Sequence, residues 1–415
     1  MIENLAYLNP FNARSASRLS RVVDARLSAL IHDARQYSPY YARMLGRDVC
    51  TQATLIDLPT LSRTTLQTYL PEITRPLARG ERLLHLRTSG STGRPFELPV
   101  IVSEAHISDL LWLRLYTALG LRPWHVQGKF SHTGPRPARW IQRFGILRRS
   151  YCPAAAWPTE KVDWLREVRP HALFGWASLL GEVARELESQ QDAVEIPMIF
   201  SSSDMLWDGL RRQIIERLGG QVRDVYGAEE TGPIAWECPV GGGYHVRQDW
   251  VYIELLDDDD RPASSGRVVC TVLWRRLTPL IRYEIGDAAE WADEPCACGS
   301  PFPRLKKLHG RQQDLMPVPG GGWISAGTLE SLIYGLQNIR QFQFVQQSAK
   351  HLKLRLVLAH PPLGRDEATI VARFLDRFAG RLTLGIETVD EIEKAGRAKF
   401  TPFLTLPDDT LSGVG

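Results

Sequence analysis

Short apolar strands that alternate with helices are the feature that most constrains this fold. Ala172-Leu173-Phe174-Gly175 and Met198-Ile199-Phe200 are apolar runs with the length and composition of buried strands. A helical pattern over 206–218 stops at Gly219-Gly220, and another strand pattern follows at 222–226. This alternation extends from about residue 130 to residue 290 and predicts α/β architecture for the large N-terminal part of the chain.

Three helix signals precede this region, and one turn signal lies within it. Apolar positions at helix spacing predict a helix over 15–46, and the segment 58–62 predicts a helix start with a serine or threonine cap. An amphipathic helix is expected over 103–119, with Ser103 as its cap. The acidic run 257–260 is followed by Arg-Pro and is interpreted as a solvated hairpin turn.

The pattern changes after residue 310. A tight glycine turn over 317–323 is followed by helices and strands in mixed order. These elements predict a small α+β unit of normal domain size, which gives a large domain over 1–312 and a small C-terminal domain over 313–415. Within the small domain, helices are expected over 326–336 and 366–379, and strands over 341–347, 352–359 and 382–389.

The composition is that of an ordinary globular protein. The chain has 415 residues, 44% hydrophobic content and a formal net charge of +3, which fit two or three domains. No basic block indicates nucleic acid, and no apolar stretch of about 18 residues indicates a membrane span. A secretory signal is not expected, and six cysteines in this length do not indicate a disulfide framework. We therefore expect a cytoplasmic protein with neither nucleic acid nor a membrane as its partner.

A loop rich in glycine and hydroxyl residues precedes the main α/β region. The stretch RTSGSTGRPF spans Arg87 to Phe96, and its glycines allow a ligand to approach the backbone closely. Its hydroxyl and N–H groups suit phosphate oxygens, and Arg94 adds a cation. The stretch does not match the G-x-x-x-x-G-K-[ST] phosphate loop, and the residues after it are extended. A hairpin tip between two strands is predicted, and an ordinary polar surface turn remains an equal interpretation.

Four later segments carry further polar residues at turns. They are YGAEETG at 226–232, RYEIGD at 282–287, GRQQD at 310–314 and GRAKF at 396–400. The first places two carboxylates directly after a predicted buried strand, and the second ends a strand on an aspartate. Each segment alone is ordinary turn chemistry and indicates little.

Together and in this order, the five segments resemble the adenylate-forming superfamily. The match is closest to its short branch, the phenylacetate–CoA ligase-like proteins. TSGSTGRP is similar to the TSGTTGKP phosphate loop of that branch, YGAEETG to its YGxSExG segment, RYEIGD to its RYxTGD, and GRQQD to its GRxDD hinge. The resemblance covers nearly the whole chain. It implies a large α/β N-terminal domain and a small, mobile α+β C-terminal domain.

The resemblance also implies a role for individual residues in binding ATP and Mg²⁺. Glu230 is expected to hold Mg²⁺ near the α-phosphate, and Asp287 to accept hydrogen bonds from the ribose. Arg311 is expected on the ribose or phosphate side, Gln313 at the hinge, and Lys399 between the acyl carboxylate and the α-phosphate. The phosphate-loop residues implied are Thr88, Ser89, Gly90, Ser91, Thr92, Gly93 and Arg94, and the adenine-binding residues are Ser203, Asp204, Tyr226 and Gly227.

Three departures from the pattern of the family stand out. Gln313 is neutral where the hinge is commonly Asp or Lys. The segment 317–325 replaces the RGxN-like segment of CoA-using members, which puts CoA as the acceptor in doubt. Either Lys399 or Arg397 can align with the catalytic lysine, and Lys399 is favoured because Lys-Phe precedes a terminal Pro-Phe strand.

The acyl pocket is expected beside predicted strands. His132 resembles the gate residue near the acyl pocket, and an ordinary surface histidine is nearly as good an interpretation. Phe174, Gly175 and Trp176 follow or end a buried strand, where sites of α/β proteins usually form, and are interpreted as pocket wall.

Cysteine and histidine spacing predicts a structural zinc site. Cys238 and His245 lie just after the glutamate segment, and Cys296-Ala297-Cys298-Gly299 lies some fifty residues later. Three thiolates and one imidazole complete a tetrahedral Zn²⁺ shell, with no open position for catalysis. The alternative is a set of unpaired buried cysteines. Cys50, Cys152 and Cys270 are interpreted as core or surface residues without a function.

The expected activity is ATP-dependent activation of a carboxylic acid as an acyl-adenylate with release of pyrophosphate, and an aryl acid is one candidate. The acyl group would then pass to a thiol, on CoA or on a carrier protein. Three alternatives stay open: transfer to an amine, adenylyl transfer to a hydroxyl, and a degenerate nucleotide-binding module.

Overall fold

The computed structural model describes most of the chain. The described residues are 16–45, 51–88, 96–131, 140–154, 156, 158–203, 206–311, 315–317, 323–325, 329, 332–333, 336, 338–348, 350–378, 380–392 and 403–404. The chain divides into two compact units. Unit 1 comprises Met1–Thr88, Phe96–Ile285 and Glu290–Lys307, and unit 2 comprises Ser89–Pro95, Gly286–Ala289 and Leu308–Gly415. The predicted domain boundary at 312 and 313 lies outside the described residues and stays a prediction.

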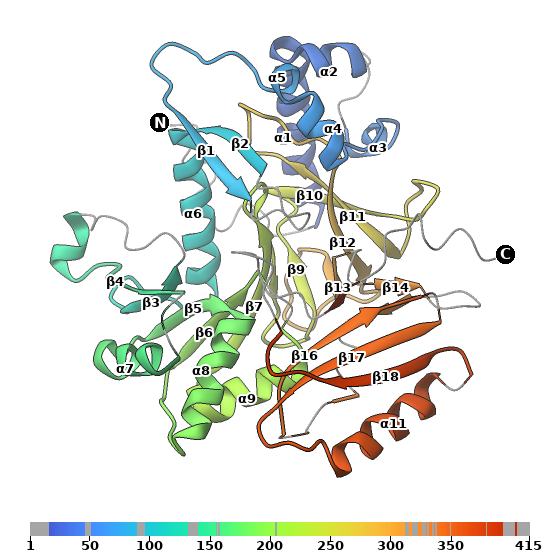
Figure 1. Cartoon of the computed structure of the whole chain (residues 1–415). Helices are drawn as coiled ribbons and strands as arrows, with labels where there is room; N and C mark the ends of the chain where they lie inside the picture. The colour runs from blue at the N-terminus through green and yellow to red at the C-terminus, as the bar shows by residue number, and fades with distance from the viewer. Residues whose placement is uncertain are drawn as a thin grey trace. The chain divides into compact units, whose positions relative to one another are not determined.

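An 11-stranded mixed sheet forms the centre of the larger unit (Figure 1). Its strand order is β10-β11-β12-β13-β9-β8-β7-β6-β5-β3-β4. Strands β3 to β7 pair in parallel, and β7, β8 and β9 pair antiparallel. The strands are β3 (Gln127–Ser131), β4 (Arg149–Pro153), β5 (Ala172–Trp176), β6 (Met198–Ser202), β7 (Gln221–Ala228), β8 (Gly232–Glu237), β9 (Tyr244–Val246), β10 (Val251–Leu256), β11 (Ser265–Val272), β12 (Tyr283–Trp291) and β13 (Arg304–Arg311).

Helices cover both faces of the parallel strands. Successive residues of a strand face opposite sides, and both sets of side chains here are apolar and need to be buried. Leu173 and Ile199 join the core beneath α7 (Pro158–Val168), α8 (Ala177–Ser189) and α9 (Asp208–Leu218). Phe174 and Phe200 instead pack against Leu113 and Tyr116 of α6 (Val102–Ala118). Both faces of these strands are apolar, which explains their continuous apolar runs in the sequence.

The strand–helix alternation ends at β7, so its predicted extension to residue 290 is wrong. Residues 219–311 are all described, and they contain strands and turns but no helix. The links between these strands are short; the run 257–260, for example, connects the antiparallel strands β10 and β11 as predicted. A parallel crossover requires a dozen or more residues, so links shorter than this, such as 229–231 and 257–264, return the chain antiparallel.

Helical segments near the N-terminus show where local sequence sets the boundaries. The predicted helix over 15–46 is broken at Ser38, which caps α2 by accepting a hydrogen bond from the Tyr41 N–H. Ser62 caps α4 as predicted, whereas the predicted Ser103 cap is wrong because α6 begins at Val102 without a side-chain cap. The helices are α1 (Ala16–Tyr37), α2 (Pro39–Met44), α3 (Gln52–Leu55), α4 (Arg63–Thr68) and α5 (Leu70–Ile73).

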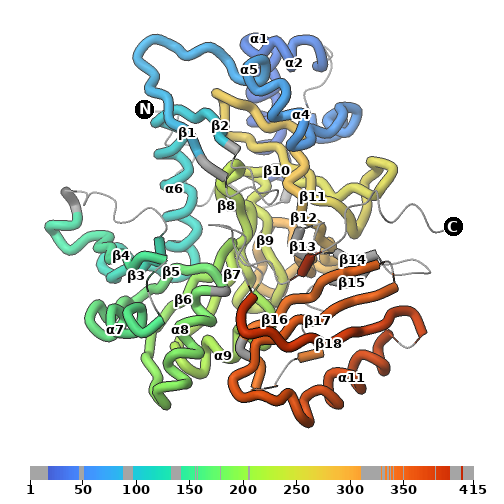
Figure 2. The backbone as a smooth tube through the Cα atoms, viewed as in Figure 1, coloured from blue at the N-terminus to red at the C-terminus, as the bar shows by residue number. Residues whose placement is uncertain are grey.

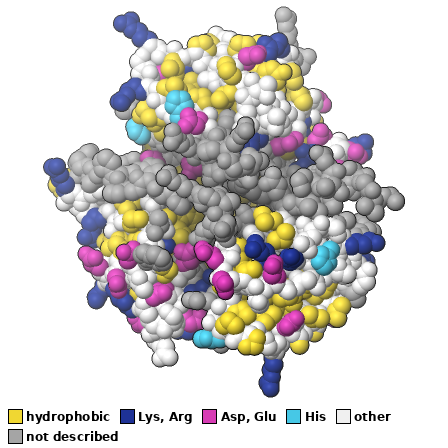
Figure 3. Space-filling view, in the orientation of Figure 1, with side chains coloured by type: hydrophobic (Ala, Val, Ile, Leu, Met, Phe, Trp, Pro, Cys, Tyr) yellow, Lys and Arg dark blue, Asp and Glu magenta, His cyan; other side chains and the backbone are white. Residues whose placement is uncertain are grey.

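The smaller unit contains a four-stranded sheet in the order β18-β17-β16-β19 and one described helix, as the backbone trace shows (Figure 2). Helix α11 (Arg365–Phe378) buries Ile370, Phe374 and Phe378. Val371 and Leu375 lie beside this face and are exposed, and hydrophobic side chains gather over α11 in the space-filling view (Figure 3). The strands are β14 (Leu315–Pro317), β15 (Trp323–Ser325), β16 (Ile339–Gln346), β17 (His351–Leu358), β18 (Thr383–Thr388) and β19 (Phe403–Leu404). Strands β16, β17 and β18 confirm the three predicted strands, and α11 confirms the predicted helix 366–379, whereas most of the predicted helix 326–336 lies outside the described residues.

Strands β1 (Leu83–Thr88) and β2 (Phe96–Ile101) pair antiparallel up to Thr88 and Phe96. The loop between them is therefore a hairpin tip, as predicted, although residues 89–95 themselves lie outside the described part of the chain.

Candidate active site and metal centre

The carboxyl ends of the parallel strands bring predicted site residues to one edge of the sheet. Trp176 is in register with Ser202, and Ser202 with Val225. Ser203 and Tyr226 each follow one residue later. Ligands of open α/β sheets bind at this edge, so the predicted adenine-binding residues occupy a suitable position.

Ser203 has an unusual backbone conformation. Its φ of 74° lies in the left-handed region, which non-glycine residues adopt at an energetic cost. Such strain is found preferentially at functional sites. Asp204, the adjacent predicted residue, lies outside the described residues.

The glutamate segment forms the tip of the β7–β8 hairpin. Gly227 pairs with Pro233 and Ala228 with Gly232, which leaves Glu229, Glu230 and Thr231 as the turn. Glu229 is exposed, whereas Glu230 is only 7% exposed. The turn therefore presents one carboxylate to solvent and holds the other inside the protein.

Two glycines allow this tip to close. A Cβ at Gly227 would lie 2.5 Å from the Gly232 carbonyl oxygen and 3.2 Å from Trp112 of α6. Gly232 has a φ of 72°, and a Cβ there would lie 3.2 Å from the ring of Trp274. The two limbs approach so closely that a side chain at Gly227 would separate them.

Glu230 accepts a hydrogen bond from Tyr283, the second residue of RYEIGD. The Tyr283 hydroxyl lies 3.3 Å from Glu230 Oε1. Burial and the neighbouring Glu230 carboxylate raise the pKa of Tyr283 well above its usual value, so the hydroxyl stays a donor at neutral pH. Sequence reasoning assigned no role to Tyr283, although it lies within a quoted motif.

A buried arginine lies near the same carboxylate and was also missed. Arg275 is 1% exposed, and its Nε and Nη1 make no hydrogen bond with a described residue. Burial lowers the pKa of Arg275, and the charges of Glu104, Glu230 and Glu229 oppose that shift. Glu104 also accepts hydrogen bonds from the backbone N–H groups of Arg276 and Leu277, which ties the start of α6 to the segment between β11 and β12 that carries Arg275. No sequence pattern distinguishes Arg275 from a surface arginine.

The predicted pocket-wall residues lie near a buried aromatic cluster. Phe174 is 7% exposed, and its ring lies 4.6 Å from that of Tyr116 and 5.0 Å from that of Phe200. Lys129 Nζ lies 4.4 Å from the centre of the Phe174 ring. Gly175 has no room for a side chain, because a Cβ there would lie 2.8 Å from Phe130. Phe174 is thus a core residue, and a role in lining an acyl pocket stays a prediction.

Other predicted site residues are described only in part. Thr88 ends β1, Asp287 lies half-buried within β12, and Arg311 ends β13. Outside the described residues are Ser89, Gly90, Ser91, Thr92, Gly93, Arg94, His132, Asp204, Gln313, Arg397 and Lys399. Their predicted roles stay predictions.

A second buried carboxylate lies on β7, two residues before Tyr226. Asp224 is 7% exposed and accepts a hydrogen bond of 2.7 Å from the Tyr244 hydroxyl. Burial raises the pKa of Asp224 to about 6. Because Tyr244 precedes His245, this hydrogen bond links the strand of the glutamate hairpin to the strand that carries a predicted zinc ligand.

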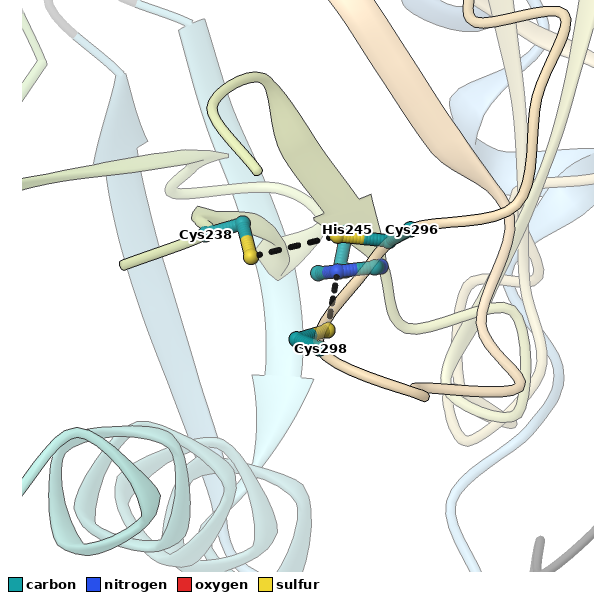
Figure 4. Close-up of side chains that lie close together, drawn as sticks. All are labelled: Cys238, His245, Cys296 and Cys298. Carbon is teal, nitrogen blue, oxygen red and sulfur yellow. Dashed lines mark hydrogen bonds between the residues drawn. The ribbon is translucent and has the colours of Figure 1, made fainter. Parts of the chain in front are cut away.

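The four predicted metal ligands converge (Figure 4). The ligand atoms of Cys238, His245, Cys296 and Cys298 all lie within 4.8 Å of one another. The sulfurs of Cys238 and Cys296 are 3.5 Å apart, and His245 Nε2 is 3.2 Å from Cys298 Sγ. Donors at the corners of a tetrahedral zinc site with Zn–S bonds of about 2.3 Å are separated by distances of this order.

Surrounding groups orient these ligands as in metal centres. His245 Nδ1 lies 3.1 Å from the Phe302 carbonyl oxygen, which leaves Nε2 to face the sulfurs. The Gly241 N–H donates to Cys238 Sγ, and a Cβ at Gly241 would lie 2.6 Å from Cys296 Sγ. Three sulfurs and one imidazole nitrogen, with the ring oriented from behind, fit Zn²⁺. By contrast, Cys152 and Cys270 are buried in the core, in line with their interpretation as core or surface residues.

Comparisons with known proteins agree with the resemblance seen in the sequence. Residues 317–402 match the family model described as the CapK C-terminal domain. A phenylacetate–coenzyme A ligase of Thermus thermophilus is 25% identical over 326 residues, which cover 73% of this chain and 72% of that protein. Protein CapK of Staphylococcus aureus is 23% identical over 245 residues, covering 58% of this chain and 53% of CapK.

Solved structures share the fold. A crystal structure of 2-hydroxyisobutyryl-CoA ligase in its postadenylation state matches with a TM-score of 0.77 over 97% of this chain and 94% of that chain, at 17% identity. The α/β architecture predicted for an adenylate-forming enzyme is therefore confirmed. In the described part of the chain, no helix combines the length and apolar content needed to cross a membrane.

Proposed function

We propose that this chain, a phenylacetate–CoA ligase-like member of the adenylate-forming superfamily, is an ATP-dependent ligase that activates a carboxylic acid and transfers its acyl group to a thiol. The acid would displace pyrophosphate from ATP to form an acyl-adenylate. The thiol would then displace AMP and take the acyl group.

One observation carries this proposal. The β7–β8 hairpin holds Glu230 inside the protein at the carboxyl edge of the parallel sheet, where nucleotides bind in such folds. A buried carboxylate is costly unless it is paired. Here Tyr283 donates a hydrogen bond to the carboxylate and the cationic Arg275 is nearby, and both interactions offset part of that cost.

The chemistry requires such a carboxylate. Attack on the α-phosphorus builds negative charge on phosphoryl oxygens, which a bound Mg²⁺ offsets. Glu230 would hold that ion, and the hydrogen bond from Tyr283 would orient one carboxylate oxygen so that the other faces the metal. Positioning of the reactants supplies most of the remaining acceleration in reactions of this type. Lys399 is proposed to bridge the acyl carboxylate and the α-phosphate.

CoA is the acceptor that the relatives favour, because several are named as CoA ligases. Two of the similar proteins suggest an aryl acid, since their names include phenylacetate and anthranilate, whereas 2-hydroxyisobutyryl-CoA ligase is named for an alkyl acid. The departure at 317–325 keeps a carrier-protein thiol as the second choice of acceptor. An amine is the third choice, because an amide bond synthetase also shares the fold with a TM-score of 0.51.

The Cys238–His245–Cys296–Cys298 cluster is proposed to bind structural zinc. Its four donors would fill a tetrahedral shell and leave no position for substrate. Cys296 and Cys298 lie between β12 and β13, whereas Cys238 follows β8 and His245 lies in β9. A bound ion would cross-link the loop after the glutamate hairpin to the β12–β13 loop, most of which is exposed over 293–299.

Pyrophosphate release tests the activity. The protein is incubated with ATP, Mg²⁺ and a panel of aryl and alkyl acids, with and without CoA. We expect acid-dependent release, together with consumption of CoA and formation of AMP. Release that leaves CoA untouched would point to a carrier protein or an amine. A product that retains AMP on a hydroxyl would show adenylyl transfer, and no release with any acid would contradict the proposal.

Two neighbouring glutamates provide a matched pair of variants. Glu230→Gln removes the buried charge and should reduce pyrophosphate release about 10²- to 10³-fold, the usual effect of losing an electrostatic stabiliser. Glu229→Gln changes an exposed carboxylate in the same turn and should retain most of the activity. Equal losses in the two variants would show that the turn, and not the Glu230 charge, matters. Lys399→Ala should abolish adenylation and retain thioester formation from supplied acyl-adenylate.

Metal analysis tests the zinc site. Protein purified without chelator should contain about one equivalent of zinc, and Cys298→Ser should lose most of it. Cys152→Ala, which removes a thiol distant from the cluster in the sequence, should retain the metal. Less than about a tenth of an equivalent in the unmodified protein would contradict a four-ligand site.

A further inference from the structure

Residues 110–159 carry a charge that the whole-chain total conceals. This segment holds eight arginine and lysine residues and no aspartate or glutamate, whereas the formal net charge of the chain is only +3. The rest of the chain therefore has a net negative charge. Segregated charge of one sign is the electrostatic signature of a surface that meets a partner of opposite charge.

Two turns from this segment lie side by side at the end of the sheet. One turn leads into β3, and the other leads into β4, the edge strand, which Figure 2 shows at the left of the sheet. The Leu147 N–H donates to the Pro123 carbonyl at 2.5 Å, and the Gln127 N–H donates to the Arg148 carbonyl at 2.9 Å. These backbone hydrogen bonds fix the turns as one continuous surface.

Exposed apolar side chains stand on this surface among cations. Trp124 is 64% exposed, Phe144 71% and Ile146 41%. Arginines flank them, and we name the whole set the basic–aromatic patch: Arg122, Trp124, Arg143, Phe144, Ile146 and Arg148. All three arginines are exposed, and none forms an ion pair with any residue that the structure describes. Large apolar side chains grouped in this way on a surface mark an interaction site.

The location of the patch indicates what kind of partner fits. Its turns precede β3 and β4, so it lies at the amino ends of the parallel strands. Ser203 and Glu230 follow the carboxyl ends of β6 and β7, Tyr226 lies near the carboxyl end of β7, and a five-residue strand alone is about 17 Å long. An acyl acceptor would have to reach the carboxyl ends of the strands, on the side of the sheet opposite the patch. The location of the patch therefore suits binding to a surface that takes no part in the reaction, and not binding of the acyl acceptor.

We infer that the basic–aromatic patch binds the surface of a bilayer that contains anionic phospholipids. The side chains of Trp124, Phe144 and Ile146 would enter the interfacial layer, and the arginines would contact lipid phosphates. Aromatic rings that accompany cations are characteristic of proteins that lie on a membrane without spanning it. This peripheral contact revises the expectation, based on the lack of an apolar stretch of about 18 residues, that no membrane is a partner. It is independent of the proposed ligase activity.

Vesicle sedimentation tests the inference. The full-length protein is mixed with vesicles of phosphatidylcholine alone or with 30 mol% phosphatidylglycerol, at low and high salt. We expect binding to the anionic vesicles that weakens as salt screens the charges. The double variant Trp124→Ala/Phe144→Ala should weaken binding at least tenfold. Arg143→Glu/Arg148→Glu should do the same, since each cation near an anionic surface contributes about a fivefold effect.

Matched controls come from the other unit. Leu375→Ala removes a residue that is 54% exposed, and Arg377→Glu reverses an exposed cation. Both variants should bind like the unmodified protein. Each variant is first shown to retain the unfolding temperature of the parent. No binding to anionic vesicles, or equal losses in patch and control variants, would overturn the inference. Binding of the patch to an acidic carrier protein without vesicle binding would also overturn it, and would identify a protein partner instead.

Discussion

Arg282→Met is the perturbation whose effect follows most directly from the structure. The Arg282 side chain is 2% exposed and forms a two-pronged ion pair with Glu254, with N···O distances of 3.1 and 3.2 Å. Its Nη1 also donates to the carbonyl oxygens of Ile56 and Leu58. One guanidinium therefore joins the start of β12 to β10 and to the segment before α4.

The magnitude follows from what the variant leaves behind. Methionine fills much of the volume but leaves Glu254, which is only 11% exposed, without its cation. Removing one partner of a buried ion pair costs about 3–5 kcal/mol. For a unit of this size, that loss lowers the unfolding temperature by roughly 5–10 °C.

The pH dependence of Arg282→Met gives a second, independent expectation. Burial already raises the pKa of Glu254 despite Arg282, and loss of the cation will raise it further. A carboxyl whose pKa is higher in the folded state than in the unfolded state stabilises the folded state when it is protonated. The free energy of unfolding therefore falls as pH rises from the unfolded-state pKa to the folded-state pKa. The destabilisation by Arg282→Met should therefore be smaller at pH 5 than at pH 7.5.

Thermal and urea unfolding, followed by tryptophan fluorescence, measure the effect at both pH values. The double variant Arg282→Met/Glu254→Gln should lose less stability than the two single variants together, because no buried charge remains. Arg166→Met, which removes an arginine with two exposed ion-pair partners, serves as the control and should change stability little. Additive single losses, or a loss that is the same at both pH values, would refute the reasoning.

Three further perturbations test other parts of the site. Tyr283→Phe removes the hydrogen bond to Glu230 and should lower pyrophosphate release about tenfold with little change in stability; an unchanged rate would show that the hydroxyl does not orient the carboxylate. Gly227→Ala places a Cβ 2.5 Å from the Gly232 carbonyl oxygen. It should lower the free energy of unfolding by about 1–3 kcal/mol and remove most of the activity. Full activity would contradict the close approach of the two hairpin strands. Because the pKa of Asp224 is raised to about 6, the unmodified protein should lose stability as pH rises from about 4 to 6. Asp224→Asn removes this carboxyl. The variant should not show that loss and should be more stable at pH 7 by up to about 3 kcal/mol, which urea unfolding across this pH range will measure.

Local patterns in the sequence were sufficient for much of this protein. The apolar runs at 172–175 and 198–200 became buried strands, because a strand with helices on both faces must be apolar on both sides. Gly219 ends α9 with a φ of 66°, as its sequence position predicted. The pairing of the strands on either side of RTSGSTGRPF and the convergence of Cys238, His245, Cys296 and Cys298 followed from residue type and spacing.

The tertiary structure alone decided which of two similar residues is buried. Glu229 and Glu230 are adjacent and identical, and only the β7–β8 register turns Glu230 inward to meet Tyr283. Arg275 and Arg276 are likewise indistinguishable in sequence, yet only Arg275 is almost fully buried near Glu230. Residue type and spacing define elements and their faces, because those depend on neighbours along the chain. The environment of a charge depends instead on segments far apart in sequence, here residues 104, 230, 275 and 283, which meet only when the sheet is assembled.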